Sequence, residues 1–365
     1  MARAITIHEQ IPEKWLNIEP LHAMQLLPEL EKPTIVKYAS RNAVQGARWM
    51  VTLQHANESS GLYGFVDLWK KLVRDDVRLD YDLYFLIANG SGAMAREEYQ
   101  VFGRRFAPDQ IDFNRCWNKP GERGREDMPM MQREQVEELT QRILESYPAR
   151  VIDIHNTTGK NKPLAFVQER YASGVLVHNL VDHIIYSGPL PGSLLDRFSD
   201  TCETITIECG KTGTLESFMA CTEIMGRFVD YKNNDEKRVG KQPLFYQELG
   251  RMLIQEGVDF SFYDALGYDE GHRSKNFERG KLFVRSDIEE FNQTSVDEFG
   301  SLGLYEGDDF PLRFLEHGVD KTAEYIQMNG REMEIMKPTY GLLFTTNVHN
   351  IRVTELGYLM ERRGL

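Results

Sequence analysis

The chain has 365 residues, of which 41% are hydrophobic, and a formal net charge of −13. This length allows one large domain or two ordinary ones, and the apolar content is enough for a substantial core. The negative charge argues against a nucleic-acid partner and against an anionic lipid surface, because both need a basic face.

From residue 47 to residue 231, apolar strand patterns alternate with helical patterns, whereas residues 1–45 are mixed and hard to interpret. Strands followed by turns are expected at 47–55, 79–92, 149–159 and 202–213, and helices at 59–76, 133–148 and 214–231. The mainly apolar segment 174–188 is ambiguous between the two. This alternation predicts an α/β fold with a mixed, largely parallel central sheet flanked by helices, which binds ligands at the carboxyl ends of its strands.

The residue composition and the pattern of expected elements change after about residue 235. Residues 233–242 are polar and charged, a helix-like piece follows at 244–256, and short strand candidates such as 340–347 come later. We therefore expect two domains, a catalytic domain over 1–235 and a smaller strand-rich domain over 236–365.

The sequence also carries hints about the protein's setting. The N-terminus has no apolar core of a signal peptide, and no apolar run approaches the ~20 residues that span a bilayer. The four cysteines form no CxxC pair and no disulfide-rich pattern. We expect a cytoplasmic protein without a membrane partner. A small anionic substrate is still compatible with the acidic chain, since a few local arginines can create a positive pocket.

Three of the expected strands end in an ionisable side chain. The first ends at His55, with Glu58 three residues later, the second at His155, and the third at Glu208. Side chains alternate between the two faces of a strand, so each strand can deliver one such group at its end. Two histidines and one glutamate are a sufficient ligand set for catalytic zinc, with a fourth position left for water. Glu208 is then the candidate base for that water.

Each of these residues also has an ordinary interpretation when taken alone. An HxxE pattern is common, a strand histidine is more often a core residue with satisfied nitrogens, and a strand glutamate can pair with a lysine. The spacing is informative only when the residues are considered together.

A fourth motif strengthens the argument. Residues 112–115 read Asp-Phe-Asn-Arg, and the order HxxE, DxNR, Asp153-Ile-His-Asn-Thr-Thr and Glu208-x-Gly resembles the succinylglutamate desuccinylase/aspartoacylase family. The resemblance covers roughly 47–215 and implies a zinc amidohydrolase with a zinc carboxypeptidase-like fold. Ala56 replaces a glycine that is frequent in the family, and the turn after Glu208 differs from that of aspartoacylase.

The resemblance implies a role for each matching position. His55, Glu58 and His155 would hold one zinc ion per chain, and Glu208 would activate water. Asn114 and Arg115 would bind a substrate carboxylate, which the planar guanidinium fork suits. Arg105, with Arg104 as the spare, would polarise the scissile carbonyl, and Arg197 would read a second carboxylate. From its place on the His155 face, we expect Asp153 to orient a ligand imidazole, that of His55.

The sequence therefore predicts a zinc-dependent hydrolase of the amide bond of N-acyl amino acids or similar small carboxylated amides. The C-terminal domain would restrict the active-site mouth. A zinc carboxypeptidase acting on peptide C-termini is the alternative, because the same ligands and the Asn-Arg pair would serve it. A catalytically inactive protein that binds a small acid is the third reading. The acyl group and the oligomeric state are left open.

Overall fold

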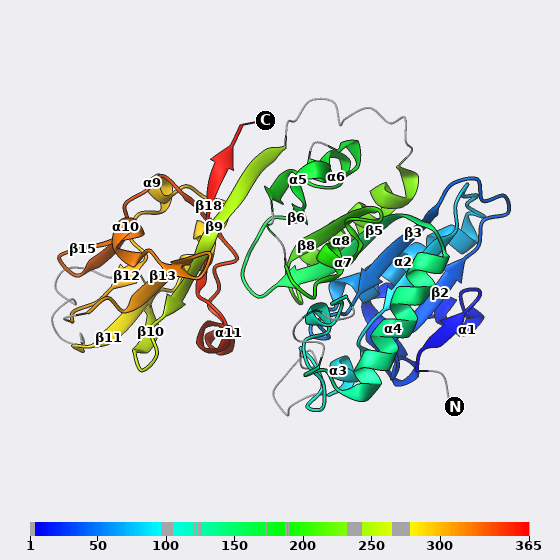
Figure 1. The fold of residues 1–365 in the computed structure, drawn as a ribbon, viewed down its shortest axis with the longest axis horizontal. Helices are drawn as coiled ribbons and strands as arrows, with labels where there is room; N and C mark the ends of the chain where they lie inside the picture. The colour runs from blue at the N-terminus through cyan, green and yellow to red at the C-terminus, as the bar shows by residue number, and fades with distance from the viewer. Residues whose placement is uncertain are drawn as a thin grey trace. The chain divides into compact units, whose positions relative to one another are not determined.

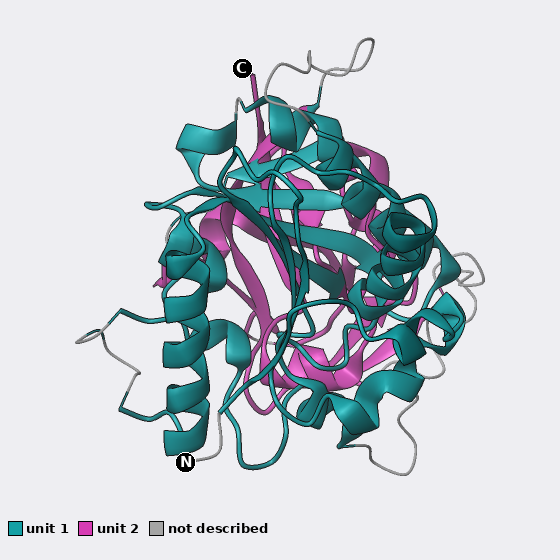
Figure 2. Ribbon diagram, turned by 90° about the vertical axis from the view of Figure 1, so that its right-hand side faces the viewer, with its two compact units in different colours: residues 1–156, 163–243 teal, residues 157–162, 244–365 magenta. Residues whose placement is uncertain are grey.

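The computed structural model describes residues 4–95, 105–119, 122, 126–172, 174–186, 188, 190–231, 243–264, 278–307 and 309–364. The chain divides into two compact units (Figure 2). Unit 1 comprises residues 1–156 and 163–243, and unit 2 comprises residues 157–162 and 244–365. Within the described residues, no helix has the length and apolarity needed to cross a bilayer.

Unit 1 is built on a mixed, mostly parallel sheet (Figure 1). Its strands follow the spatial order β1 (Thr6–His8), β2 (Thr34–Tyr38), β4 (Leu83–Ile87), β3 (Ala47–Thr52), β5 (Pro148–Thr157), β8 (Glu203–Lys211), β6 (Leu164–Val167) and β7 (His183–Tyr186). Strand β3 runs parallel to both β4 and β5, whereas β2 is antiparallel to β4 and β6 is antiparallel to β8. The predicted fold class is confirmed.

Helices cover both faces of this sheet, as the alternation of side chains along β3 shows. Trp49 and Val51 point to one face, where they share a core with apolar residues of α4 (Met130–Glu145). Thr52 lies against α2 (Ser60–Arg74) on the other face, so close that a Cβ on Gly61 would come within 1.8 Å of its hydroxyl oxygen. Helix α2 packs in turn against α8 (Leu215–Asp230). The central strands are thus buried on both sides, as a parallel sheet requires.

Shorter elements complete unit 1. They are α1 (Glu13–Leu16), α3 (Gly90–Met94), α5 (Glu169–Ala172), α6 (Val175–Leu180), α7 (Leu194–Phe198) and two 3-10 helices, η1 (Pro20–Glu29) and η2 (Phe113–Arg115). The ambiguous segment 174–188 contains helix α6 followed by strand β7.

Unit 2 is rich in strands. Its first group contains β9 (Leu244–Ile254), β13 (Leu312–Glu316), β14 (Val319–Asp320), β17 (Tyr340–Leu342) and β18 (Gly357–Arg363), and its second sheet has the order β10 (Asp259–Tyr263), β11 (Lys281–Arg285), β12 (Gly303–Leu304), β16 (Glu332–Ile335) and β15 (Ile326–Asn329). Short helices η3 (Ile288–Phe291), α9 (Val296–Phe299), α10 (Thr322–Tyr325) and α11 (Val348–Val353) join them. All pairings in the second sheet are antiparallel except that of β10 with β11.

The helix expected over 244–256 is wrong, because this segment forms strand β9. It pairs antiparallel with β13 on one side and with β18 on the other. Gly250 allows the close approach of β13, since a Cβ there would lie 2.3 Å from the carbonyl oxygen of Leu315. Two neighbouring strands satisfy the backbone groups of β9, and this tertiary pairing outweighs local helix propensity.

Residues 157–162 belong to unit 2 although they follow β5 directly. The backbone N–H of Lys160 donates to the Glu289 carboxylate at 2.9 Å, and that of Lys162 donates to Gln293 at 2.8 Å. The side-chain amide of Asn292 donates to the carbonyl of Lys160 at 2.9 Å. This short loop is therefore held by its backbone groups within unit 2.

Candidate metal centre

His55 and Glu58 lie in the connection between the end of β3 and the start of α2. The chain turns after β3 at Leu53, whose φ is +54°. The backbone N–H of Glu58 then donates to the carbonyl of His55 at 3.0 Å. This turn brings the two side chains together, with Nδ1 of His55 at 2.8 Å from Oε1 of Glu58.

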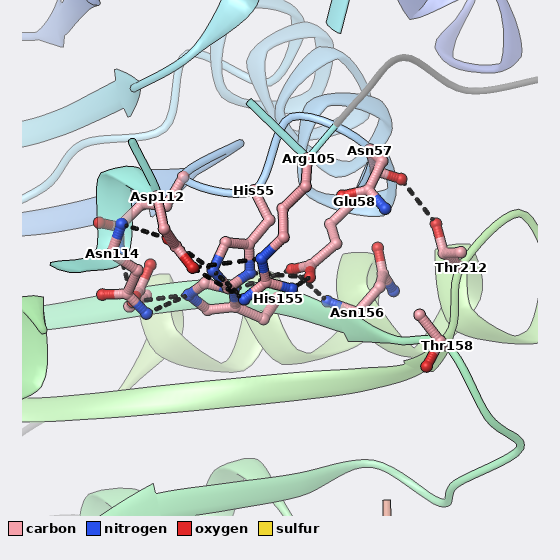
Figure 3. A network of polar contacts seen from close by, with 12 residues as sticks. His55, Asn57, Glu58, Arg105, Asp112, Asn114, His155, Asn156, Thr158 and Thr212 are labelled. Carbon is pink, nitrogen blue, oxygen red and sulfur yellow. Dashed lines mark hydrogen bonds and ion pairs between the residues drawn. The ribbon is translucent and has the colours of Figure 1, made fainter. Parts of the chain in front are cut away.

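His155 reaches the same place from the neighbouring strand. Because β5 is parallel to β3, with Ile154 opposite Thr52, the carboxyl ends of the two strands meet. Nδ1 of His155 lies 2.8 Å from Oε2 of Glu58 and 3.1 Å from Nδ1 of His55 (Figure 3). All three side chains are buried. We call His55, Glu58 and His155 the triad.

The triad suits a divalent cation. Within the described residues, the triad forms a cluster of potential metal ligands. One ligand atom from each residue lies within 4.8 Å of those of the other two. Two ligand atoms on a tetrahedral zinc ion are roughly 3.3 Å apart, which is close to the separations seen here. The two Nδ1 atoms also present lone pairs to one another when both imidazoles are neutral, and a cation between them removes that repulsion.

The outer nitrogen of each imidazole faces a carboxylate. Nε2 of His155 lies 2.7 Å from Oδ2 of Asp153, and Nε2 of His55 lies 3.1 Å from Oδ1 of Asp112. The contact to Asp153 places the proton of His155 on Nε2 and leaves its Nδ1 as the ligand atom. Nε2 of His55 faces both the Asp112 carboxylate and Nη2 of Arg105, and only the tautomer that carries the proton on Nε2 leaves its Nδ1 as a ligand atom. The expected pairing of Asp153 with His55 is wrong. Residues two apart share one face of a strand, so Asp153 meets His155 instead.

Asp112 is the partner of His55 that sequence reasoning missed, although it is the first residue of the DxNR motif. Its carboxylate also accepts a hydrogen bond from the backbone N–H of Asn114 at 2.9 Å, which fixes the start of η2. The motif thus joins a contact to a ligand imidazole with a local helix cap. An aspartate directly before a short helical turn was a usable signal for such a cap.

Arg105 lies beside the triad. Its Nη2 is 3.1 Å from Oδ2 of Asp112 and 2.7 Å from Nε2 of His55, and its Nη1 is 3.8 Å from Oε1 of Glu58. The Asp112 carboxylate therefore orients both His55 and Arg105. Arg104, the spare candidate, is outside the described residues.

The carboxylates of Glu58 and Asp112 are held in their charged form. Burial alone would raise the pKa of Glu58, but the charges and hydrogen bonds of His55 and His155 hold this pKa well below its ordinary value. The pKa of Asp112 is likewise low, because His55 and Arg105 outweigh the effect of burial. A cluster of ionised carboxylates around two imidazoles is a favourable setting for a cation.

Glu208 extends from β8 and is half-buried, with its Oε2 atom buried and without a hydrogen-bond partner among the described residues. Burial and the negative charge of Glu58 raise the pKa of Glu208 to about 8, against weaker opposing effects of His155 and Arg105. Strand β8, which carries Glu208, neighbours β5, which carries His155.

The three candidate substrate-binding residues differ in position. Asn114 is buried, with Nδ2 3.4 Å from Nε2 of His155 and Oδ1 accepting from the backbone N–H of Leu194 at 3.1 Å. Arg115 is exposed and donates to the Asn114 carbonyl at 2.8 Å. Arg197 lies on α7 with its guanidinium 5.5 Å from the Phe198 ring centroid. Of the three, Asn114 contacts a triad imidazole.

Comparison with known proteins agrees with this geometry. Residues 50–217 match the family model of the succinylglutamate desuccinylase/aspartoacylase catalytic domain. No functionally curated protein matches the sequence.

Solved structures share the fold at low sequence identity. A succinylglutamate desuccinylase from Chromobacterium violaceum is similar with a TM-score of 0.57 and 13% identity over 94% of this chain and 98% of that one. One from Vibrio parahaemolyticus is similar with a TM-score of 0.56 and 12% identity over 90% and 86%. A succinylglutamate desuccinylase/aspartoacylase from Rhodobacter sphaeroides has a TM-score of 0.52 and 12% identity over 91% and 88%. Residues 50–217 thus match the catalytic domain of the succinylglutamate desuccinylase/aspartoacylase family, and the chain shares the fold of these solved structures.

Proposed function

We propose that this protein is a zinc-dependent hydrolase that cleaves the amide bond of N-acyl amino acids or of similar small carboxylated amides. The observation that carries the proposal is the convergence of two Nδ1 atoms and one carboxylate at the carboxyl ends of β3 and β5. The match of residues 50–217 to the family's catalytic domain supports the same class of reaction.

His55 and His155, each through Nδ1, and Glu58 would hold the zinc ion. The chemistry that zinc supplies at such a site is polarisation of a carbonyl and acidification of a water molecule. Asp112 and Asp153 keep the two imidazoles in the tautomer that ligation needs.

Glu208 acts as the proton carrier of the reaction. Its carboxylate takes the proton of the attacking water and then delivers it to the amine that leaves. A carboxylate with a raised pKa is a stronger base than an exposed one, and burial together with the Glu58 charge provides that increase. A bound dication acts in the opposite direction and lowers the pKa of Glu208 from its metal-free value.

Arg105 stabilises the negative charge that develops on the carbonyl oxygen. With its proton on Nε2, His55 donates a hydrogen bond to Oδ1 of Asp112, and the guanidinium of Arg105 pairs with Oδ2 of Asp112 and with the substrate. The same carboxylate thus holds Arg105 beside the triad and leaves some of its N–H donors available to the substrate.

Asn114 and Arg115 bind the carboxylate of the amino-acid half. Arg115 is exposed and uses one donor on the Asn114 carbonyl, and a guanidinium has five. A second carboxylate contact by Arg197 stays a prediction, as does narrowing of the active-site mouth by the C-terminal part of the chain.

The test is a substrate panel on protein of known metal content. N-acetyl and N-succinyl amino acids are compared with dipeptides, and a chelated sample serves as the control. We expect hydrolysis of the acyl amino acids that disappears on chelation and returns with zinc. Preferential cleavage of dipeptides would favour the carboxypeptidase alternative. Zinc-loaded protein that hydrolyses neither class would contradict the proposal.

A further inference from the structure

One buried side chain connects the three segments that carry the triad and Glu208. Asn156 follows His155 directly and is 3% exposed. Its Oδ1 accepts from the backbone N–H of Ser60 at 3.1 Å, and its Nδ2 donates to the carbonyl of Gly210 at 3.2 Å. These partners require the assigned orientation of the amide, since a backbone N–H can only donate and a carbonyl can only accept.

Each partner of Asn156 is two residues from a group of the active site. Ser60 starts α2, two residues after Glu58, and Gly210 lies in β8, two residues after Glu208. The backbone N–H of Asn156 also donates to Oε2 of Glu58 at 3.0 Å (Figure 3). Asn156 therefore contacts the segment that carries Glu58 and the segment that carries Glu208, and it directly follows His155 in the chain.

We propose that Asn156 is a positioning residue whose side-chain amide sets the spacing between the triad and Glu208. We call the hydrogen bonds of Oδ1 and Nδ2 the two arms of Asn156. The Oδ1 arm holds the start of α2, and with it Glu58, against β5. The Nδ2 arm holds β8, and with it Glu208, against β5. The inference rests on the proposed function, because a spacing between ligand and base matters only if Glu208 carries protons for the reaction.

The two arms can be separated by substitution. Asn156→Leu removes both arms and keeps a similar volume. Asn156→Asp keeps the acceptor for Ser60 but, when ionised, loses the donor to Gly210 and sets an acceptor against a carbonyl. The backbone bond to Glu58 survives in both variants. The two substitutions should therefore have different effects on metal binding and on turnover.

Zinc affinity is measured by competition with a chromophoric chelator, and steady-state kinetics are measured on zinc-saturated protein at pH 8. For Asn156→Leu we expect zinc affinity to fall about 10-fold or more and kcat to fall as well. For Asn156→Asp we expect zinc affinity at least as tight as wild type, because an anion is added beside the site. Its kcat should fall by about 10-fold or more with little change in KM, because Glu208 is displaced.

Thr204→Val is the matched control. Thr204 is buried on β8 and donates to the carbonyl of Cys202 at 3.2 Å, so this variant removes a buried hydrogen bond from the same strand. It should keep wild-type zinc affinity and kcat, and thermal unfolding reports the stability of all three variants.

Two outcomes would overturn the inference: wild-type zinc affinity and kcat in both Asn156 variants, or equal losses in Thr204→Val. If Asn156→Leu does not fold, Asn156→Asp alone decides through the split between zinc affinity and kcat. If the wild type hydrolyses no substrate, the proposed function fails, and the Asn156 inference then fails separately if zinc affinity is the same in Asn156→Leu as in wild type.

Discussion

Replacement of Glu208 by glutamine tests the assignment of the base and has an effect on stability that can be worked out from the structure. The glutamine side chain is nearly isosteric and carries no charge. Because Glu208 is not among the residues of the triad, the variant should bind zinc normally. Its turnover should fall by about 10² to 10⁴-fold, the usual contribution of a positioned proton-transfer group.

The effect on the metal-free protein has a definite sign. The pKa of Glu208 is raised from 4.5 to about 8 in the folded state, mainly by burial. The folded state therefore holds this proton more tightly than the unfolded state does between these two pH values. The stability that protonation of Glu208 contributes to the wild type should be fully present below about pH 4.5. It should be lost progressively as the pH rises to about 8.

The magnitude has an upper bound. At ~1.4 kcal/mol per pKa unit, the difference between 4.5 and about 8 corresponds to roughly 5 kcal/mol. The half-buried position of Glu208 reduces this value, and a gain of about 1–3 kcal/mol for Glu208→Gln relative to wild type is expected at pH 9 compared with pH 5. Bound zinc should shrink the effect.

The assay is urea unfolding of the chelated wild type and variant at both pH values, with kinetics and zinc content measured in parallel. Equal pH dependence of stability in the two proteins would refute the raised pKa of the carboxyl group at this position. A variant with wild-type turnover would refute its role as the base.

The remaining predictions concern outer contacts and the fold. Asp153→Asn should weaken zinc retention on dialysis by about 10- to 100-fold, because the partner of Nε2 in His155 changes from a carboxylate to an amide; unchanged zinc occupancy would remove this role. Arg115→Ala should raise KM about 10- to 100-fold with a smaller change in kcat, and an equal loss in both would place Arg115 in the chemical step instead. Gly250→Ala should lower the unfolding free energy by about 1–3 kcal/mol in urea titrations, because its Cβ would overlap the Leu315 carbonyl oxygen.

The triad could be predicted from sequence because it depends on local rules. His155 follows from the two-residue period of β5, and His55 with Glu58 follows from a strand that ends before a helix. Parallel pairing of β3 and β5 then makes the strand ends meet, which the alternation of elements already indicates.

The outer contacts of the two imidazoles differ in how far they could be predicted. For Asp153 the two-residue period of β5 already favoured His155 as the partner, as the structure shows. Asp112 reaches His55 only because the chain returns after a long connection. No pattern of local spacing contains that information.

Strand β9 shows the same limit for the fold. Its sequence has residues that favour a helix, and the strand exists because β13 and β18 lie on either side of it. Those partners come from distant parts of the chain, so a local reading of 244–256 has no access to them.

The loop at 157–162 limits how this protein can be dissected. The chain passes from unit 1 to unit 2 one residue beyond Asn156, returns at residue 163, and leaves again after residue 243. A fragment ending at residue 243 would keep every member of the triad yet lose the partners of Lys160 and Lys162, only a few residues past His155. Expressed alone, such a fragment should bind metal poorly, so shuffling or grafting of the family domain has to carry unit 2 with it.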